Sequence, residues 1–134
     1  MTDTPVKVLV YSDNRLVREQ VRLTLGKKVA RDLPEIEVLE VATHSAVIRA
    51  LDSDTKYSLV ILDGEAQPSG GFGLAYQMKD EYADCPPMIL LIKRNVDAWL
   101  ATWSRADAIA PYPLDPFQLP EQAANLLREE LATA

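Results

Sequence analysis

The chain of 134 residues contains few of the residue types that build disulfides, zinc sites and catalytic triads. Its single cysteine, Cys85, has no partner for an internal disulfide, which fits a reducing cytoplasm. Its single histidine, His44, has no cysteine or second histidine at ligand spacing, so a zinc site is not expected. No convincing Ser-His-Asp set can be assembled around one histidine, so we expect His44 to be a surface residue rather than a catalytic one.

Long apolar runs and an excess of positive charge are also missing. The longest uninterrupted apolar run is Met88 to Ile92, far too short to span a bilayer, and residues 1–5 do not have the pattern of a signal peptide. The formal net charge of −6 argues against non-specific binding to nucleic acids, which requires Lys and Arg to replace phosphate counterions. We therefore expect a cytoplasmic protein that binds no nucleic acid and reaches a membrane only through a partner.

What the chain does contain is an alternation of strand and helix patterns along its whole length. Short runs rich in β-branched and apolar residues predict strands at 6–11, 36–41, 57–62, 88–92 and 108–110. Apolar residues at helical spacing predict helices at 15–25, 44–51, 72–82, 95–104 and about 120–131. Asp115-Pro116 is expected to form a 3₁₀ turn before the last of these helices.

This alternation determines the predicted fold. Five strand–helix units require parallel strands with right-handed crossovers and helices on both faces of the sheet. We predict one α/β domain over residues 1–134, a flavodoxin-like, doubly wound sheet of five parallel strands in the order 2-1-3-4-5 with five helices. In such sheets, ligands bind beyond the carboxyl ends of the central strands. Asp13 and Asp63 follow the first and third strands, so we expect them to meet at this edge.

The pair of Asp13 and Asp63 allows two interpretations from spacing alone. Two acids that converge on one spot can bind a hard divalent cation through oxygen, or take part in acid–base chemistry. Alternatively, Asp13 is only an acid at a helix N-terminus, and Asp63 only begins a loop. Spacing favours neither interpretation over the other.

Three segments, in their order and spacing, resemble the receiver domains of response regulators. Val8 to Glu19 is similar to the opening of a receiver, where an acidic pair ends the first strand. Leu59 to Asp63, with Gly71 eight residues later, is similar to the phosphoacceptor strand and its loop. Ala106 to Leu119 is similar to the last strand and the turn after it. The resemblance covers nearly the whole chain, and it implies that Asp63 is equivalent to the phosphoacceptor.

The chain departs from the receiver pattern at three positions that would serve a phosphoryl group. Ser12 replaces the first acid of the pair, Ile92 replaces the hydroxyl residue at the end of the fourth strand, and Tyr112 replaces the lysine before Pro113. Phosphoryl transfer depends mainly on positioning and on neutralising the charge of the equatorial oxygens. Without the lysine and the hydroxyl group, an acceptor at Asp63 is expected to be a poor switch.

The resemblance also implies the shape and the ligands of the site. Asp13, Asp63 and Glu65 are expected to form an acidic pocket. Because one acid of the pair is lost, we expect no firm metal site, at most weak Mg²⁺ binding by Asp13 and Asp63, and no other cofactor. The family keeps a cis peptide at the equivalent of Tyr112-Pro113, so we expect a cis bond there, with Tyr112 turned outward.

The predicted fourth helix carries the chain's two tryptophans. Trp99 and Trp103 lie four residues apart and therefore share a face. Val96 and Leu100 already provide an inward stripe, so we expect Trp103 in solvent and Trp99 mainly in the core. In receivers this helix and the fifth strand form the usual docking and dimer face. The resemblance thus implies a partner-binding surface of Trp99, Trp103 and Tyr112, on which a homodimer could also form.

The chain as a whole is similar to the orphan single-domain receivers found with bacterial proton-pumping NADH dehydrogenase, respiratory complex I. This resemblance implies a degenerate receiver without catalytic activity, acting as an accessory or regulatory subunit through protein–protein docking. The peripheral arm of complex I is the partner that the resemblance suggests. No output domain is expected after the last predicted helix.

Two other function classes stay open. One is a phosphorylatable receiver of a two-component system, which takes a phosphoryl group from a histidine kinase on Asp63. The other is a small-ligand or flavin-binding domain, because flavodoxin-like sheets bind such ligands at the same edge. Binding of a phosphate analogue with magnesium would distinguish the first, and the colour of the purified protein would distinguish the second.

Overall fold

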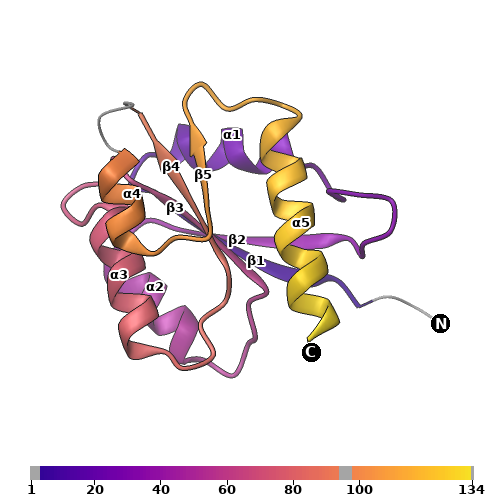
Figure 1. The fold of residues 1–134 in the computed structure, drawn as a ribbon, viewed down its shortest axis with the longest axis horizontal. Coiled ribbons are helices and arrows are strands. Elements are labelled where there is room, and N and C mark those ends of the chain that lie inside the picture. Colours follow the sequence, from indigo (N-terminus) through magenta and orange to yellow (C-terminus); the bar gives the residue numbers. More distant parts are fainter. Residues whose placement is uncertain (1–3, 94–97, 134) are drawn as a thin grey trace.

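The predicted alternation of strands and helices is present in the computed structural model, which describes residues 4–93 and 98–133 (Figure 1). The strands are β1 (Val6–Tyr11), β2 (Ile36–Val41), β3 (Leu59–Asp63), β4 (Met88–Ile92) and β5 (Ala108–Pro111). The helices are α1 (Arg15–Leu25), α2 (His44–Asp52), α3 (Gly71–Glu81), α4 (Ala98–Ser104) and α5 (Gln118–Ala132).

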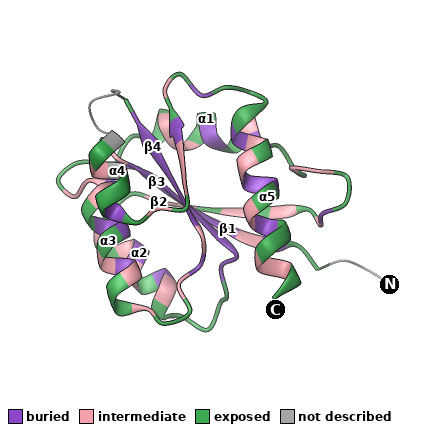
Figure 2. Cartoon of the chain, viewed as in Figure 1, coloured by how far each residue is buried: buried purple, intermediate pink, exposed green. Residues whose placement is uncertain are grey.

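All strand pairs are parallel, and the sheet has the order β2-β1-β3-β4-β5, which confirms the predicted topology. The central strands β3 and β4 are buried along their whole length, as Figure 2 shows. They can be apolar on both faces because helices cover both sides of the sheet. One core cluster packs under α1 and α5, and a second packs under α2 and α3.

The residues at both ends of the first helix explain where it begins and where it ends. α1 begins after Asn14, whose side-chain Oδ1 accepts a hydrogen bond from the N–H of Leu16 at 2.9 Å. It ends at Gly26, which adopts a φ of 66° and donates its N–H to the carbonyl of Arg22. Because this φ is in the left-handed region, a glycine is the residue best suited to end the helix there.

Two element boundaries differ from the prediction. β3 begins at Leu59 rather than at residue 57, because Tyr57 is buried in the core cluster under α2 and α3 but lies before the ladder. α5 begins at Gln118 rather than near Pro120, directly after a turn instead of a 3₁₀ segment. Asp115 fixes this start, since its Oδ1 accepts hydrogen bonds from the N–H groups of Phe117 and Gln118 at 2.7 and 2.9 Å.

Pro120 then falls in the first turn of α5, where its missing N–H has no partner to lose. The predicted start of the fourth helix at residue 95 lies outside the described residues, and α4 is described from Ala98. Within the described part of the chain, no helix is both long and apolar enough to cross a membrane.

Candidate functional site

The site lies where β1 and β3 end side by side. The two strands pair in parallel with Tyr11 opposite Leu62, so the next residues, Ser12 and Asp63, are neighbours. Both are buried, and the Ser12 hydroxyl donates a hydrogen bond to Oδ2 of Asp63 at 2.7 Å. The residue that replaces an acid in the receiver pattern is therefore the direct partner of the predicted phosphoacceptor position.

Both oxygens of the Asp63 carboxylate are engaged within the chain. Oδ2 accepts from Ser12, and Oδ1 accepts from the backbone N–H of Glu65 at 2.8 Å. The Ser12 oxygen also accepts from the N–H of Asn14 at 3.0 Å, so the small hydroxyl links the start of α1 to the end of β3. A carboxylate held by donors on both sides is fixed in place, and its charge is partly balanced by hydrogen bonds.

The three predicted acids share one cavity. Asp13, Asp63 and Glu65 line a pocket of about 670 Å³, with Asp63 buried and the other two exposed. The pocket is completed by Asn14, Val17, Gln20, Lys93, Tyr112 and Pro113. Within the described residues, no three His, Cys, Asp or Glu side chains come together closely enough to hold a metal ion. Weak Mg²⁺ binding by Asp13 and Asp63 stays a prediction.

Tyr112 does not point outward, so this part of the prediction was wrong. Its ring packs against the core cluster under α1 and α5, and it lines the acidic pocket. The hydroxyl is buried near the Asp63 carboxylate, without a hydrogen bond of normal geometry among the described residues. Burial and the nearby negative charge of Asp63 raise the pKa of Tyr112 far above its usual range.

The inward position of Tyr112 has a simple physical reason: an aromatic ring at the pocket's edge gains more from burial than from solvent. The Tyr112-Pro113 peptide bond is cis, as predicted. Tyr112 therefore occupies space in the acidic pocket and is not part of an outward-facing partner surface.

Ile92, the third substituted position, also offers no group that could bind a phosphoryl oxygen. Ile92 ends β4, is 5% exposed, and packs in the core cluster under α2 and α3. A hydroxyl group at this position is replaced by an aliphatic side chain that offers no donor. The nearest strong donor along the chain is the next residue, Lys93, which lines the pocket.

Two residues of the site were not singled out from the sequence. Lys93 lines the pocket, and its position directly after β4 could have identified it. Tyr11 lies at the end of β1, and its hydroxyl donates to the backbone carbonyl of Ser69 at 2.5 Å. This bond ties the loop after Asp63 to β1. Burial and the charges of Asp13 and Asp63 raise the pKa of Tyr11.

The loop after Asp63 reaches α3 through glycines that allow close packing. A Cβ atom on Gly71 would lie 2.8 Å from the backbone oxygen of Asp63, whereas one on Gly73 would meet nothing within 4 Å. The two glycines lie in the same helical turn, at a buried and an exposed position. Gly71 is therefore needed for the close approach of α3 to β3, whereas no close approach requires a glycine at position 73.

This difference yields a prediction about stability. Gly71→Ala should lower the free energy of unfolding by about 1 to 3 kcal/mol, because the backbone of β3 must shift to admit the methyl group. Gly73→Ala, the matched control, should raise it by about 0.5 to 1 kcal/mol, because alanine favours the helix. Urea unfolding curves of both variants measure the two changes. Equal effects would show that Gly71 is not needed for the close approach.

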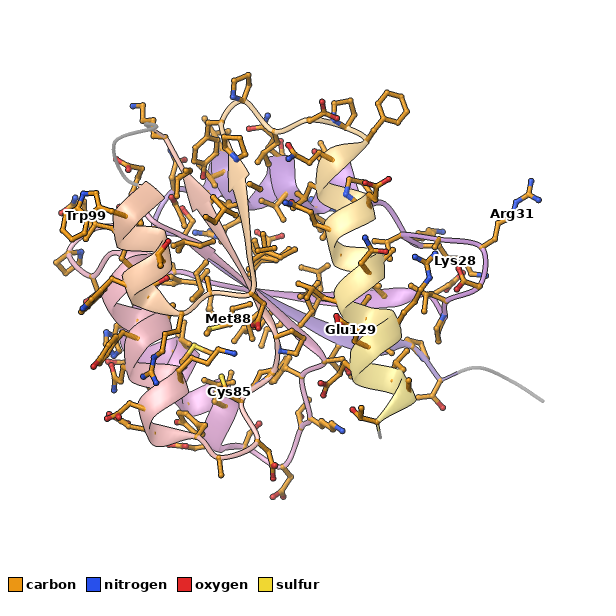
Figure 3. All side chains as sticks on the ribbon, in the orientation of Figure 1. Lys28, Arg31, Cys85, Met88, Trp99 and Glu129 are labelled. Carbon is orange, nitrogen blue, oxygen red and sulfur yellow. The ribbon has the colours of Figure 1, made fainter. Side chains whose placement is uncertain are left out.

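The tryptophans of α4 form an exposed aromatic patch with a tyrosine of α3. Trp99 is 67% exposed and Trp103 is 47% exposed, so the expectation that Trp99 belongs mainly to the core was wrong. The ring of Trp103 stacks on that of Tyr76, with centroids 4.5 Å apart and planes at 13°. Trp99 projects from the surface beside α3 and α4 (Figure 3). These three side chains are called the aromatic patch below.

The register of α4 explains why both tryptophans face solvent. Leu100 and Ser104, four residues apart, take the more buried side of the helix, and Ser104 is fully buried. Trp99 and Trp103 each lie one position earlier and share the neighbouring, outer stripe. Arg105 adds a cation beside the patch, with its guanidinium carbon 4.6 Å from the centre of the Tyr76 ring.

The fold and the pocket at its carboxyl edge define a CheY-like α/β domain. Solved structures with this fold include the receiver domain of a signal transduction histidine kinase from Syntrophus aciditrophicus (TM-score 0.76, 21% identity, 92% of this chain and 91% of that one). A CheY-like receiver protein from Methanospirillum hungatei gives a TM-score of 0.73 at 16% identity, covering 98% of this chain and 100% of that one. At such identities the likeness shows the fold alone.

A much closer relative establishes the family. The chain is 50% identical over 127 residues to an uncharacterised response regulatory protein of Mycobacterium tuberculosis strain H37Rv, and the match covers 95% of each chain. The protein of strain CDC 1551 gives the same values. No protein-family model matches the chain. The chain therefore belongs to the response-regulator receiver family.

Proposed function

We propose that this receiver works without a phosphorylation switch, as a docking module for a protein partner. The observation that carries the proposal is the state of the Asp63 carboxylate. It is 3% exposed, and both of its oxygens already accept hydrogen bonds, from Ser12 and from the backbone of Glu65. Each oxygen keeps a second lone pair, but the two donors draw on the charge of the carboxylate, and its burial leaves a phosphodonor in solvent little access to it.

The charges around Asp63 support the same proposal. A phosphoryl group brings negative charge, which must be neutralised by cations or directed donors. The described lining of the pocket holds three acids, and Lys93 is its only cation. Tyr112 fills the place of the expected lysine with a neutral hydroxyl. Because Tyr112 offers no positive charge next to Asp63, the pocket does less than the receiver pattern to neutralise a phosphoryl group there.

The surface proposed for docking is the aromatic patch. Exposed tryptophan and tyrosine are the residue types most enriched among interface hot spots, because they bury a large area at low entropy cost. Trp99 is 67% exposed and has no ring partner among the described residues, while Trp103 is held by its stack on Tyr76. One held and one exposed aromatic ring on the same helix suit the surface of a protein partner.

The partner to test first is the peripheral arm of respiratory complex I. The whole-chain resemblance to orphan receivers found with this enzyme motivates the choice, and the function would be that of an accessory or regulatory subunit. Such a partner would keep the protein in the cytoplasm at the membrane surface, without insertion of its own. A homodimer through α4 and β5 is the competing use of the same face.

A second candidate function is supported by the relative's description as a response regulatory protein. In this alternative Asp63 accepts a phosphoryl group after Ser12 releases its carboxylate. The flavin-binding alternative has no comparable support, and an absorbance spectrum of the purified protein tests it directly.

The docking proposal is tested by affinity capture from solubilised native membranes. The immobilised full chain should retain subunits of the peripheral arm, and the Asp63→Asn variant should retain them to the same extent. Asparagine keeps an oxygen for Ser12 and removes the nucleophile, which makes it the matched control. Capture that depends on Asp63 and on prior treatment with a phosphodonor would support the phosphorylation switch instead. Self-association without capture of any subunit would support the homodimer.

A further inference from the structure

A second surface, separate from the aromatic patch and from the acidic pocket, lies at the start of α5. A groove of about 470 Å³ runs between the loop that joins α1 to β2 and the first turns of α5. Six of its nine lining residues are apolar, and the other three are Glu121, Asn125 and Arg128. The apolar members are Val29, Ala30, Pro116, Phe117, Pro120 and Ala124. The groove shares no lining residue with the acidic pocket.

Phe117 marks one edge of this groove and is the most exposed large apolar side chain in the described residues. It is 81% exposed, more than either tryptophan. The start of α5 does not need this side chain, since the Asp115 carboxylate makes the capping bonds and Phe117 contributes only its backbone N–H. A phenyl ring left in water next to an apolar groove is unfavourable in the isolated chain and favourable once a partner covers it.

The groove is held in shape by a link between its two walls. Arg128 of α5 donates from Nε and Nη2 to the two carboxylate oxygens of Asp32 in the loop, at 2.8 and 2.9 Å. The hydrogen bonds from Arg128 hold the pKa of Asp32 at about 2. Next to Asp32, Leu33 is buried in the core and anchors the loop from below. A partner would therefore meet a preformed groove and lose little energy in ordering it.

The loop side of the groove rim is positively charged, against the net charge of −6 of the chain, whereas the α5 side carries one exposed acid, Glu121. Lys28 and Arg31 flank the lining residues Val29 and Ala30, and both are exposed. Neither has an ion pair within the described part of the chain, because Asp32 is taken by Arg128. Arg31 points away from the ribbon into solvent (Figure 3). Lys27 adds a third exposed cation to the same loop.

We propose that this groove docks an acidic segment of a protein, which places apolar side chains against Phe117 and the groove floor and carboxylates beside Lys28 and Arg31. An anionic membrane is disfavoured as the occupant, because the chain has a net charge of −6 and an anionic surface would repel it. The site goes beyond the proposed function, because it would let the domain hold a second segment while the aromatic patch is occupied.

The test uses NMR amide spectra of the isotope-labelled full chain and a short synthetic peptide in which Asp-Glu pairs alternate with Leu-Phe pairs. Saturable shifts at the groove are expected, and the same peptide with Lys for each acid, or with Ala for Leu and Phe, should give none. Phe117→Ala and the double variant Lys28→Glu, Arg31→Glu should each weaken binding at least about tenfold. All three side chains are exposed, so these changes leave the fold intact.

Matched controls come from other exposed positions. Trp99→Ala and Lys56→Glu remove an exposed ring and an exposed cation elsewhere, and they should leave the affinity for the peptide unchanged. The proposal is overturned if the peptide gives no saturable shifts at the groove, or if the groove variants bind as tightly as the original chain. Shifts at the groove on addition of phosphatidylserine vesicles, in place of the peptide, would assign the surface to a membrane and would also overturn it.

Discussion

Replacing Trp103 by alanine is expected to remove the domain from its partner while leaving it folded. Truncating a hot-spot aromatic costs at least about 2 kcal/mol of binding free energy, which weakens binding about thirtyfold. Trp103 is 47% exposed, so its loss leaves no cavity in the core. The loss of its stack on Tyr76 should lower the free energy of unfolding by only about 0.5 to 1.5 kcal/mol.

Trp99→Ala separates the two roles that Trp103 combines. Trp99 is 67% exposed and has no ring partner among the described residues, so this variant should lose affinity without losing stability. Leu23→Ala is the matched control, because Leu23 is 68% exposed on α1, away from the patch. Circular dichroism with urea unfolding measures stability, and surface plasmon resonance with the isolated partner measures affinity.

The Asp63→Ala variant tests whether the partner binds at the aromatic patch or at the acidic pocket. The proposed docking function predicts that this variant keeps its affinity, although Ser12 loses the acceptor of its hydroxyl and stability falls. If Asp63→Ala abolishes binding while both tryptophan variants keep it, the acidic pocket is the working site. If Trp103→Ala unfolds the protein, the ring has a structural role that its exposure does not indicate.

The fold could be predicted from the sequence because its signals are local and repeated. Each strand is a short run such as Met88–Ile92, and each run is followed by a helical period, so the parallel order follows from general rules of chain connection. The boundary error at Tyr57 has the same origin. A buried tyrosine before β3 has the same apolar character as a strand residue, although its backbone lies outside the ladder.

The meeting of Ser12 with Asp63 was also predictable, because parallel strands bring their carboxyl ends to one edge. The direction in which each aromatic side chain points could not be predicted. Tyr112 turns into the pocket and Trp99 turns out of the core, and each choice depends on the space left by residues distant in the sequence. Such packing preferences produce no recognisable pattern in the local sequence. They determine which residues of the predicted partner surface are exposed.

Restoring two of the three missing groups is expected to convert the chain into a phosphoryl acceptor. With acetyl phosphate and Mg²⁺, the original chain should show negligible labelling. An Asp63 oxygen must attack phosphorus as acetate leaves, but the carboxylate is buried, shares its charge with two donors, and has Tyr112 rather than a lysine beside it. Ser12→Asp removes one of these donors and places a second carboxylate beside the first. The two acids repel each other, and a divalent cation that binds both relieves the repulsion.

Tyr112→Lys restores the second group, because it replaces a buried neutral hydroxyl near Asp63 with an ammonium group that can contact the phosphoryl oxygens. Preorganised charge of this kind contributes about 10² to 10³ in rate for each group. The double variant should therefore label at least about a hundredfold more than the original chain, and adding Asp63→Asn should abolish the label. Mass spectrometry of the intact protein measures the added phosphoryl group. Stoichiometric, magnesium-dependent labelling of the original chain that disappears in Asp63→Asn would show that Ser12 releases the carboxylate unaided, and the receiver would then be a working switch.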